Sequence, residues 1–361
     1  MDLSIYKGKK VFLTGHTGFK GSWLSLWLVS LGAELCGYAL APDTNPALFD
    51  ILNLKKKLKH IEADIRDFDK LKKEINSFNP DIVFHLAAQP LVRYSYQNPL
   101  ETYQTNVMGT VNLFEACRSC QNIKAVVNVT TDKCYNNKES GQSYKETDEL
   151  GGYDPYSNSK ACSELVTSSY RNSFFNNEYF GKKHTTAVAS ARAGNVIGGG
   201  DFSQDRLLPD FVKAISLGKE ITLRNPKATR PWQFVLEPLS GYLLLGKKLL
   251  ENNIKFASAY NFGPYAESAI PVEDMVKKAI AAWGKGSYKV DKGEHPHEAG
   301  LLHLCIDKAG AELGWKPVYT IDDAVKKTIA WYKNYYEGGV DMTAFSNMQI
   351  AEYNGQKEFL K

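Results

Sequence analysis

Apolar runs and amphipathic stretches alternate along the first half of the chain. Lys10–Leu13 is a short apolar run that ends at Gly15, and Phe19–Leu31 follows with apolar residues at helical spacing. This order is typical of a strand, a glycine turn and a helix. Further strands are expected at Glu34–Leu40, Ile82–Leu86, Ala125–Thr130 and Thr185–Ala193, and further helices at Asp67–Phe78 and Thr105–Arg118. Strands that alternate with helices predict the α/β class with a doubly wound parallel sheet.

The regular alternation ends after Ala193. A Gly-rich stretch (194–200), a stretch with Pro and Arg (223–232) and a loop rich in Gly, Lys and His (284–300) interrupt shorter elements. Loops of this kind usually carry specificity on a rigid scaffold. We therefore expect the second half of the chain to face a substrate.

The length of 361 residues fits two domains, at roughly 100 to 200 residues per domain. Residues 1–190 with 232–262 are expected to form a Rossmann domain, and residues 191–231 with 263–361 a smaller C-terminal substrate domain. Tyr260–Phe262 is predicted to return to the first sheet as one more strand.

Composition excludes several classes of protein. The chain is 43% hydrophobic and 23% charged, which is ordinary for a globular protein and excludes a collagenous or disordered one. The net charge of +4 is too small and too dispersed for a nucleic-acid interface. Residues 1–10 show no signal peptide, and no run of about 18 apolar residues predicts a membrane helix. We expect a cytoplasmic protein without membrane or nucleic-acid partners.

The cysteines and histidines do not predict a metal site. All six cysteines are expected to be thiols in the reducing cytosol. Cys117 and Cys120 form a C-x-x-C without a second pair at zinc-ligand spacing, so we interpret them as small residues late in a helix. The loop His295–Glu298 has no helical histidine pair. Trp23 and Trp27 lie four residues apart and are interpreted as core residues of the first helix.

Glycines recur at positions 15, 18 and 21, where the first strand turns into the first helix. Without a Cβ, backbone amides can approach a pyrophosphate, and the helix N-terminus adds partial positive charge. The context of strand, turn and helix makes a dinucleotide the expected ligand. A tight turn that binds nothing is the alternative.

The residues after the second strand bear on which dinucleotide binds. Residues 37–46 contain no Arg or Lys to hold a 2′-phosphate, which favours NAD over NADP. Asp43 lies some residues beyond the strand. Asp64 follows the third apolar stretch and has two interpretations: it accepts a hydrogen bond from the adenine amino group, or it caps the helix that starts near Asp67.

Two groups of polar residues suggest catalysis. Tyr156 and Lys160 lie at i and i+4 on one helix face, and the ammonium would favour a phenolate that accepts a proton from a sugar hydroxyl. Thr131, Asp132 and Lys133 directly follow the apolar strand Ala125–Thr130. Because open α/β folds bind ligands at the carboxyl ends of their strands, both groups are expected at one site.

Several motifs together resemble the extended short-chain dehydrogenase/reductase family of nucleotide-sugar enzymes. They are Gly15-His16-Thr17-Gly18-Phe19-Lys20-Gly21, His85-Leu86-Ala87-Ala88, Asn106-x-x-Gly109-Thr110, Thr131-Asp132-Lys133-Cys134-Tyr135, Tyr156-x-x-x-Lys160, residues 193–201 and Arg230-Pro231-Trp232-Gln233. The resemblance covers nearly the whole chain. It is strongest to the members that dehydrate CDP-glucose in deoxysugar and lipopolysaccharide O-antigen biosynthesis.

The resemblance implies roles for individual residues. It implies that Thr131, Tyr156 and Lys160 carry out the oxidation, and that Asp132 and Lys133 serve the elimination. For NAD it implies contacts from Gly15, Thr17, Gly18, Phe19 and Lys20 to the pyrophosphate, from Asp64 and Ile65 to the adenine, and from Leu86, Ala87, Ala88 and Thr130 to the remainder. For the sugar nucleotide it implies contacts from Asn195, Arg206 and Arg230.

One departure bears on the substrate. Dehydratases of dTDP-glucose have Glu where this chain has Lys133, which favours CDP-glucose and leaves the base that attacks C5 open. That base could be Lys133 only if burial beside Lys160 strongly lowered its pKa.

Three alternatives to a CDP-glucose dehydratase remain. The first is a dehydratase of a dTDP-, GDP- or UDP-sugar. A C4 epimerase would use Tyr156 and Lys160 without the acid and amine at 132 and 133, and a dinucleotide sensor without catalysis should have lost Tyr156 or Lys160. The resemblance also implies a homodimer, or a multiple of one, in which helices near 107–118 and 156–170 pair across a twofold axis.

Overall fold

The computed structural model describes residues 1–138, 141–251, 254–291 and 302–355. The loop His295–Glu298, interpreted above as not binding metal, lies outside these residues. Among the described residues, no helix is long and apolar enough to cross a membrane.

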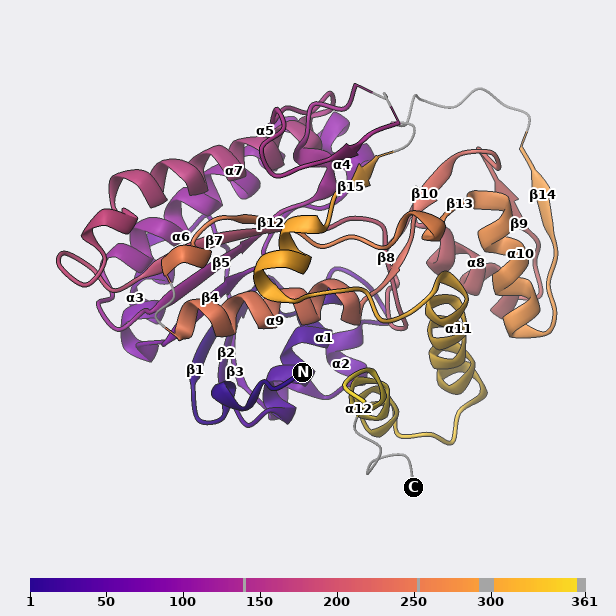
Figure 1. Cartoon of the computed structure of the whole chain (residues 1–361). Helices are drawn as coiled ribbons and strands as arrows, with labels where there is room; N and C mark the ends of the chain where they lie inside the picture. The colour runs from indigo at the N-terminus through magenta and orange to yellow at the C-terminus, as the bar shows by residue number, and fades with distance from the viewer. Residues whose placement is uncertain (139–140, 252–253, 292–301, 356–361) are drawn as a thin grey trace.

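A seven-stranded parallel sheet organises the chain (Figure 1). Its strand order is β12-β7-β5-β4-β1-β2-β3. The strands are β1 (Lys10–Thr14), β2 (Glu34–Ala39), β3 (Lys59–Glu62), β4 (Ile82–His85), β5 (Ala125–Val129), β7 (Ala187–Arg192) and β12 (Ala259–Asn261). Every residue of β4, β5 and β7 is buried, as expected for strands covered on both faces. The predicted doubly wound sheet and the returning strand near Tyr260 are confirmed.

Helices cover both faces of this sheet (Figure 1). Successive strand residues point to opposite faces. One face is covered by α3 (Phe68–Phe78), α6 (Gly109–Arg118) and α7 (Pro155–Ser173), and the other by α1 (Phe19–Ser30) and α9 (Leu236–Leu250). Phe12, Val83 and Val126 point to the first face, whereas Leu13 and Phe84 belong to the core on the other face.

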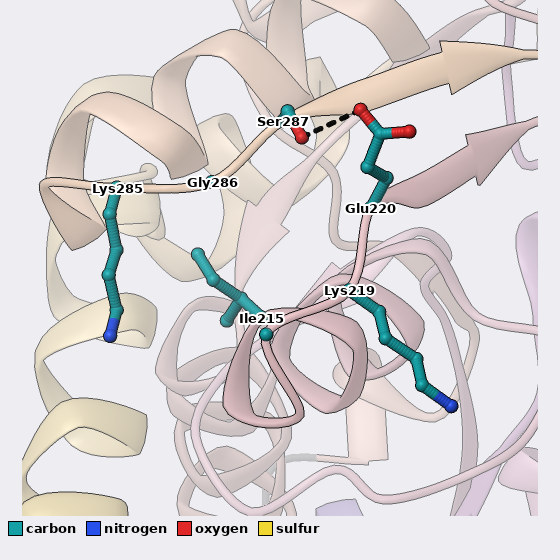
Figure 2. A pocket seen from close by; sticks show the side chains of 7 residues that line it. Ile215, Lys219, Glu220, Lys285, Gly286 and Ser287 are labelled. Atoms are coloured by element: carbon teal, nitrogen blue, oxygen red, sulfur yellow. Dashed lines mark hydrogen bonds between the residues drawn. The ribbon is translucent and has the colours of Figure 1, made fainter.

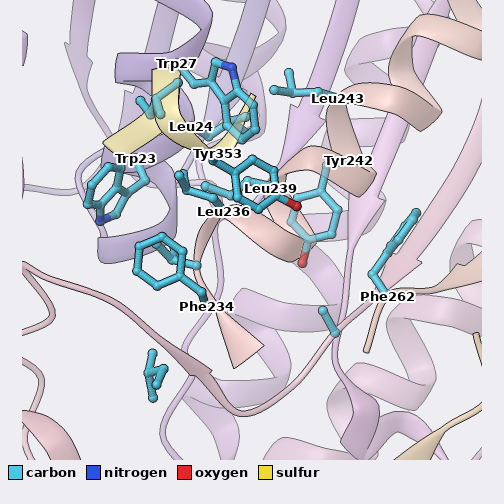
Figure 3. Packing of buried hydrophobic residues seen from close by; sticks show 14 of the residues in the cluster. Trp23, Leu24, Trp27, Phe234, Leu236, Leu239, Tyr242, Leu243, Phe262 and Tyr353 are labelled. Carbon is cyan, nitrogen blue, oxygen red and sulfur yellow. The ribbon is translucent and has the colours of Figure 1, made fainter. Parts of the chain in front are cut away.

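The tryptophans of α1 lie in the larger core, as predicted (Figure 3). Trp23 and Trp27 are both fully buried. Trp23 donates a hydrogen bond from Nε1 to the carbonyl of Gly199 at 2.9 Å. Trp27 packs edge-on against Tyr353, with 5.9 Å between the ring centroids. These contacts fasten α1 to segments from the second half of the chain.

Apart from β7, β12 and α9, the described residues of the second half form short paired strands and four helices of ten or more residues (Figure 1). They are α8 (Leu207–Ser216), α10 (Val272–Trp283), α11 (Ile321–Glu337), α12 (Met342–Tyr353) and the pairs β8 (Val196–Ile197) with β11 (Gln233–Phe234), β10 (Thr229–Pro231) with β13 (Ala269–Pro271), and β9 (Ile221–Leu223) with β14 (Tyr288–Val290). We expected a loop over 284–300, and this prediction is wrong at β14. The strand forms because its residues pair with β9, which is distant in the sequence. The two predicted domain boundaries stay a prediction.

Short elements connect these parts. They are α2 (Leu48–Ile51), α4 (Val92–Gln97), α5 (Pro99–Tyr103), β6 (Ser143–Tyr144) with β15 (His303–Leu304), the 3-10 turns η1 (Ser4–Tyr6), η2 (Leu54–Lys56), η4 (Asp132–Cys134), η5 (Asn177–Tyr179), η6 (Ile254–Phe256) and η7 (Ala266–Ser268), and the π-helical turns η3 (Gln104–Met108) and η8 (Ala309–Leu313). The helix expected from Thr105 thus begins with a π-helical turn and continues as α6.

Candidate active site

The glycine turn after β1 lies against the loop after β4. Gly15 has a φ of +75°, and a Cβ there would lie 2.7 Å from the backbone nitrogen of Ala87. A Cβ on Gly21 would lie 2.0 Å from the carbonyl oxygen of Gly15. Any side chain at these two positions would push the backbones apart. The turn and residues 86–88, predicted to bind the same dinucleotide, are therefore adjacent.

Hydroxyl groups hold these loops together. Thr14 Oγ1 accepts hydrogen bonds from the backbone amides of Leu86 and Ala87, both at 3.2 Å. Thr17 Oγ1 donates to the carbonyl of Leu40 at 2.9 Å, which connects the glycine turn to the end of β2. The loops after β1, β2 and β4 thus meet where the strand order reverses, the usual binding crevice of this sheet type.

The N-terminus of α1 can hold a pyrophosphate. Among the described residues, no side chain caps this helix at Gly18. A Cβ on Gly18 would meet only the carbonyl oxygen of Gly15, at 3.6 Å. The first amides of α1, which belong to Phe19 and Lys20, therefore have no capping side chain, and the space beside Gly18 is open. Such amides and the helix dipole bind anions, so the residues present fit a dinucleotide.

An ion pair lies where the adenine of the dinucleotide is expected to bind. Arg66 donates to Asp64 Oδ2 at 2.6 Å, and these hydrogen bonds hold the pKa of Asp64 below its ordinary value. Asp67, rather than Asp64, caps α3 by accepting from the backbone amide of Lys70. The capping interpretation of Asp64 is therefore wrong, whereas its contact with adenine stays a prediction. Ile65 is buried beside it.

Asp132 is held at the end of β5 by two donors. Its carboxyl group accepts from Thr131 Oγ1 at 2.9 Å and from Asn195 Nδ2 at 3.1 Å. Asp132 is buried, with 2% of its surface exposed. The Lys133 ammonium lies 3.9 Å from Asp132 Oδ1, and one third of the Lys133 side chain is exposed. Lys133 therefore lacks the burial that it would need in order to act as the base for C5.

The loop after β7 lies directly against this carboxyl group. A Cβ on Gly194 would lie 2.0 Å from Cγ of Asp132, so only glycine allows the approach. Asn195 follows with a φ of +52°, a conformation that asparagine tolerates better than most residues. Asn195 was expected among the substrate contacts, and in the structure its side chain holds Asp132.

Tyr156 and Lys160 occupy the first two turns of α7. Asp154 caps this helix by accepting from the amide of Ser157, and the Ser95 hydroxyl accepts from the amide of Tyr156. Tyr156 is 8% and Lys160 6% exposed. The Lys160 ammonium donates to the carbonyl of Val129, at the end of β5, over 3.4 Å. The two predicted groups are thus brought together.

Burial controls the charge of this pair. It raises the pKa of Tyr156 to about 12, although a contact with the Thr131 hydroxyl acts in the opposite direction. It also lowers the pKa of Lys160 to about 8, and the positive charge of Lys20 adds to this effect. Burial thus opposes ionisation of the phenol in the protein without ligand, and the expectation that Lys160 helps Tyr156 act as a base stays a prediction.

Further positive charge surrounds Tyr156. Burial, and next the charge of Arg206, lower the pKa of Lys20 to about 8. Arg206 donates to Asp201 Oδ2 at 2.8 Å, which raises the pKa of the guanidinium. Arg230 lies on β10 opposite Ile270, in a separate two-stranded sheet. Lys20 and Arg206 thus suit an anionic ligand beside the phenol.

A buried ion pair below the site was not predicted. Glu164 accepts from Arg192 Nη2 at 2.8 Å and from Thr130 Oγ1 at 2.5 Å. Arg192 also donates to the Tyr135 hydroxyl at 2.7 Å. The pair holds both ends of the segment that carries Thr131 to Lys133. Its sequence signal is Glu164 four residues after Lys160, on the same face of α7.

A separate cavity of about 220 Å³ lies away from these residues, beside α8 and β14 (Figure 2). Ile215, Lys219, Glu220, Lys285 and Ser287 line it, and Ser287 donates to Glu220 at 2.8 Å. No predicted site residue lines this cavity. It is therefore not part of the candidate active site.

A family model described as GDP-mannose 4,6 dehydratase matches residues 12–328. The chain belongs to this family. It is 50% identical to the CDP-glucose 4,6-dehydratase of Salmonella typhimurium over 354 residues, which cover 98% of each chain. It is also 27% identical to UDP-glucuronate 4-epimerase 1 of Arabidopsis thaliana, over 91% of this chain and 78% of that protein.

Two solved structures have the same fold as this chain. The dTDP-glucose 4,6-dehydratase of Streptomyces venezuelae, solved with NAD, has a TM-score of 0.76 and 23% identity, over 90% of this chain and 97% of that chain. The UDP-glucose 4-epimerase of Thermus thermophilus, also solved with NAD, has a TM-score of 0.76 and 24% identity, over 92% and 100%. Both confirm the predicted doubly wound fold.

Proposed function

We propose that this protein is an NAD-dependent hydro-lyase that converts CDP-D-glucose to CDP-4-keto-6-deoxy-D-glucose. One observation carries the proposal: the buried Asp132 and the buried Tyr156 both contact Thr131, so groups for elimination and for oxidation share one site. The 50% identity to a CDP-glucose 4,6-dehydratase supports the choice of base and sugar.

Tyr156 starts the reaction by accepting the proton of the sugar 4-hydroxyl. NAD would be held at the α1 N-terminus by the glycine turn of residues 15–21 and would supply the hydride acceptor and donor that the reaction needs. The phenolate that accepts the proton is stabilised by the positive charge of Arg206, and Lys160 lies one helical turn further along α7. Burial raises the pKa of Tyr156 to about 12 even though the Thr131 hydroxyl and Arg206 act against it, so bound NAD would have to add the remaining positive charge.

Elimination follows because a 4-ketone makes the C5 hydrogen acidic. Asp132 then acts as the general acid that protonates the departing 6-hydroxyl, so that water leaves. Thr131 and Asn195 hold its carboxyl group in one orientation for this transfer. Lys133 lies 3.9 Å from Asp132 but lacks the burial that a basic amine would need, so the group that removes the C5 proton stays open.

The sugar nucleotide would approach from the side where Arg206 and Lys133 are a third exposed. Arg206 and Arg230 would contact the phosphates and the base. We also infer that residues 1–190 with 232–262 form the NAD-binding part, and that residues 191–231 with 263–361 form the substrate-binding part.

The solution species would be a homodimer or a multiple of one. Leu100, Met108 and Leu165 are 71%, 51% and 57% exposed on α5, η3 and α7, which lie side by side. Exposed apolar residues on adjacent helices often mark an interface between subunits. We also propose a cytoplasmic location, which agrees with six cysteines that are all free thiols.

Product analysis in D₂O tests the proposed function. Purified protein with NAD⁺ is incubated with CDP-, dTDP-, UDP- and GDP-glucose, and the sugars are examined by NMR. We expect a new C6 methyl group and one solvent deuterium at C5, for CDP-glucose far more than for the others. A C4 epimerase would give a galactose isomer without deuterium at C5, and turnover of another nucleotide would identify a different dehydratase.

A further inference from the structure

Asp201 carries a buried carboxyl group that holds a partly exposed arginine. The residue is 3% exposed. Its Oδ2 accepts a hydrogen bond from Arg206 Nη1 at 2.8 Å, and its Oδ1 accepts from the backbone amide of Ser203 at 3.1 Å. Both carboxyl oxygens therefore have a donor, and the orientation of the group is fixed.

Buried contacts also fix the backbone of Asp201. The hydroxyl of Tyr332, on α11, donates to the carbonyl of Asp201. Two residues earlier, a Cβ on Gly199 would lie 2.0 Å from Cγ of Trp331, so the chain passes directly against α11. The carbonyl of Gly199 accepts a hydrogen bond from Trp23 of α1. The carboxyl group is thus attached to a segment that both α1 and α11 hold in place.

Arg206 connects this segment to the catalytic groups. Its positive charge acts against the burial that raises the pKa of Tyr156 and, next to burial, lowers the pKa of Lys20. The side chain of Arg206 is 34% exposed, so a ligand can reach the guanidinium. A guanidinium has five N–H donors in one plane, of which Asp201 binds one side. The other donors can bind phosphate oxygens.

We propose that Asp201 is a positioning residue that holds the Arg206 guanidinium in place for the phosphates of the sugar nucleotide, an inference that rests on the proposed function. A free arginine side chain has many conformations, and ordering it upon binding would cost affinity. The ion pair orders the side chain before the ligand arrives. By its charge alone, the carboxylate would repel a diphosphate. Geometry, rather than charge, is therefore what Asp201 contributes to binding.

Asp201→Asn distinguishes positioning from charge, because the two predict opposite changes. The amide fills the same space, but it is neutral and holds a guanidinium more weakly. Loss of the negative charge by itself would lower the Kd of an anionic ligand. If Asp201 positions Arg206, the Kd of CDP, measured by calorimetry, should instead rise about 3- to 10-fold. The Kd of NAD⁺ should change by less than about 2-fold, because the glycine turn is untouched.

Asp210→Asn is the matched control. Asp210 lies in the first turn of α8, and its strongest charged neighbours are Asp205 and Arg224. The variant also removes one negative charge near Arg206, but it leaves the ion pair between Arg206 and Asp201 in place. We expect its Kd for CDP to be unchanged or lower.

A double-variant cycle tests whether Asp201 acts through Arg206. Arg206→Gln alone should weaken the binding of CDP. Adding Asp201→Asn should then raise the Kd by less than about 2-fold further, because the guanidinium that Asp201 holds is already absent. If Asp201→Asn does not fold, Tyr332→Phe takes its place. That variant keeps the carboxylate and its charge, removes the hydrogen bond to the Asp201 carbonyl, and should raise the Kd of CDP about 3-fold.

Three results would overturn the inference. They are a Kd for CDP that is unchanged or lower in folded Asp201→Asn, an equal rise in Asp210→Asn, or losses that add in the double variant. An unchanged Kd in Tyr332→Phe has the same meaning where that variant is used. An equal rise in the Kd of NAD⁺ would also contradict the inference and assign Asp201 a structural role. If the wild-type protein bound no CDP, the proposed function itself would fail.

Discussion

Asn195 donates a hydrogen bond to Oδ2 of Asp132 at 3.1 Å, although the two residues lie 63 positions apart in the chain. Thr131 holds the other carboxyl oxygen at 2.9 Å. With both oxygens occupied, the carboxyl group keeps one orientation at the end of β5. A general acid needs such fixed geometry to reach a single leaving group.

Tyr156→Phe should abolish the reaction at its first step. The variant keeps the buried ring but has no group to accept the proton of the 4-hydroxyl, so we expect a loss of at least about 100-fold in kcat/KM. Reduced nicotinamide, followed by its absorbance after CDP-glucose is added, should not form. Normal formation of reduced nicotinamide in a folded variant would exclude Tyr156 as the base.

Asp132→Asn should separate oxidation from elimination. The amide keeps the shape of the side chain but cannot protonate the departing 6-hydroxyl. Reduced nicotinamide should therefore accumulate on the enzyme with CDP-glucose, while the 4-keto-6-deoxy product falls by an order of magnitude or more. If oxidation instead failed as completely as in Tyr156→Phe, Asp132 would belong to binding or to the oxidation step.

Gly194→Ala should impair catalysis through Asp132. The new methyl group would lie 2.0 Å from Cγ of Asp132, so the carboxyl group or the loop must move. We expect an activity loss of at least about 10-fold and a stability loss of about 1–3 kcal/mol, measured by kinetics and urea unfolding. Gly310→Ala is the control, because its Cβ would meet nothing nearer than the Trp315 carbonyl at 3.7 Å. Equal effects in both variants would contradict the role of Gly194.

Lys160 should make stability depend on pH. Burial lowers its pKa from 10.5 to about 8. Between these values the unfolded chain keeps a proton that the folded chain has lost, so this residue adds stability as pH rises from 8 toward 10. Tm measured across this range should rise more, or fall less, in the wild-type protein than in Lys160→Met. Parallel curves for the two proteins would show that the lysine is not perturbed.

Local pattern was sufficient for the sheet and the position of the glycine turn. Apolar runs such as Ile82–Leu86 and Ala125–Thr130 lie on the central strands β4 and β5, because strands buried on both faces must be apolar throughout. The spacing of Tyr156 and Lys160 placed both on one side of α7, because helix geometry fixes where residues i and i+4 lie. These features depend only on neighbours in the chain.

Tertiary structure decided what these residues can do. The pKa of Tyr156 depends on how deeply neighbouring elements bury the phenol, and no local pattern carries that information. The contact of Asn195 with Asp132 and the placement of Tyr242 beside Lys20 each join segments far apart in the sequence. The sequence by itself therefore determined which chemical groups are present and on which elements they lie. Their partners, burial and charge were decided only when the chain packed, because desolvation and hydrogen bonding depend on the three-dimensional surroundings of each group.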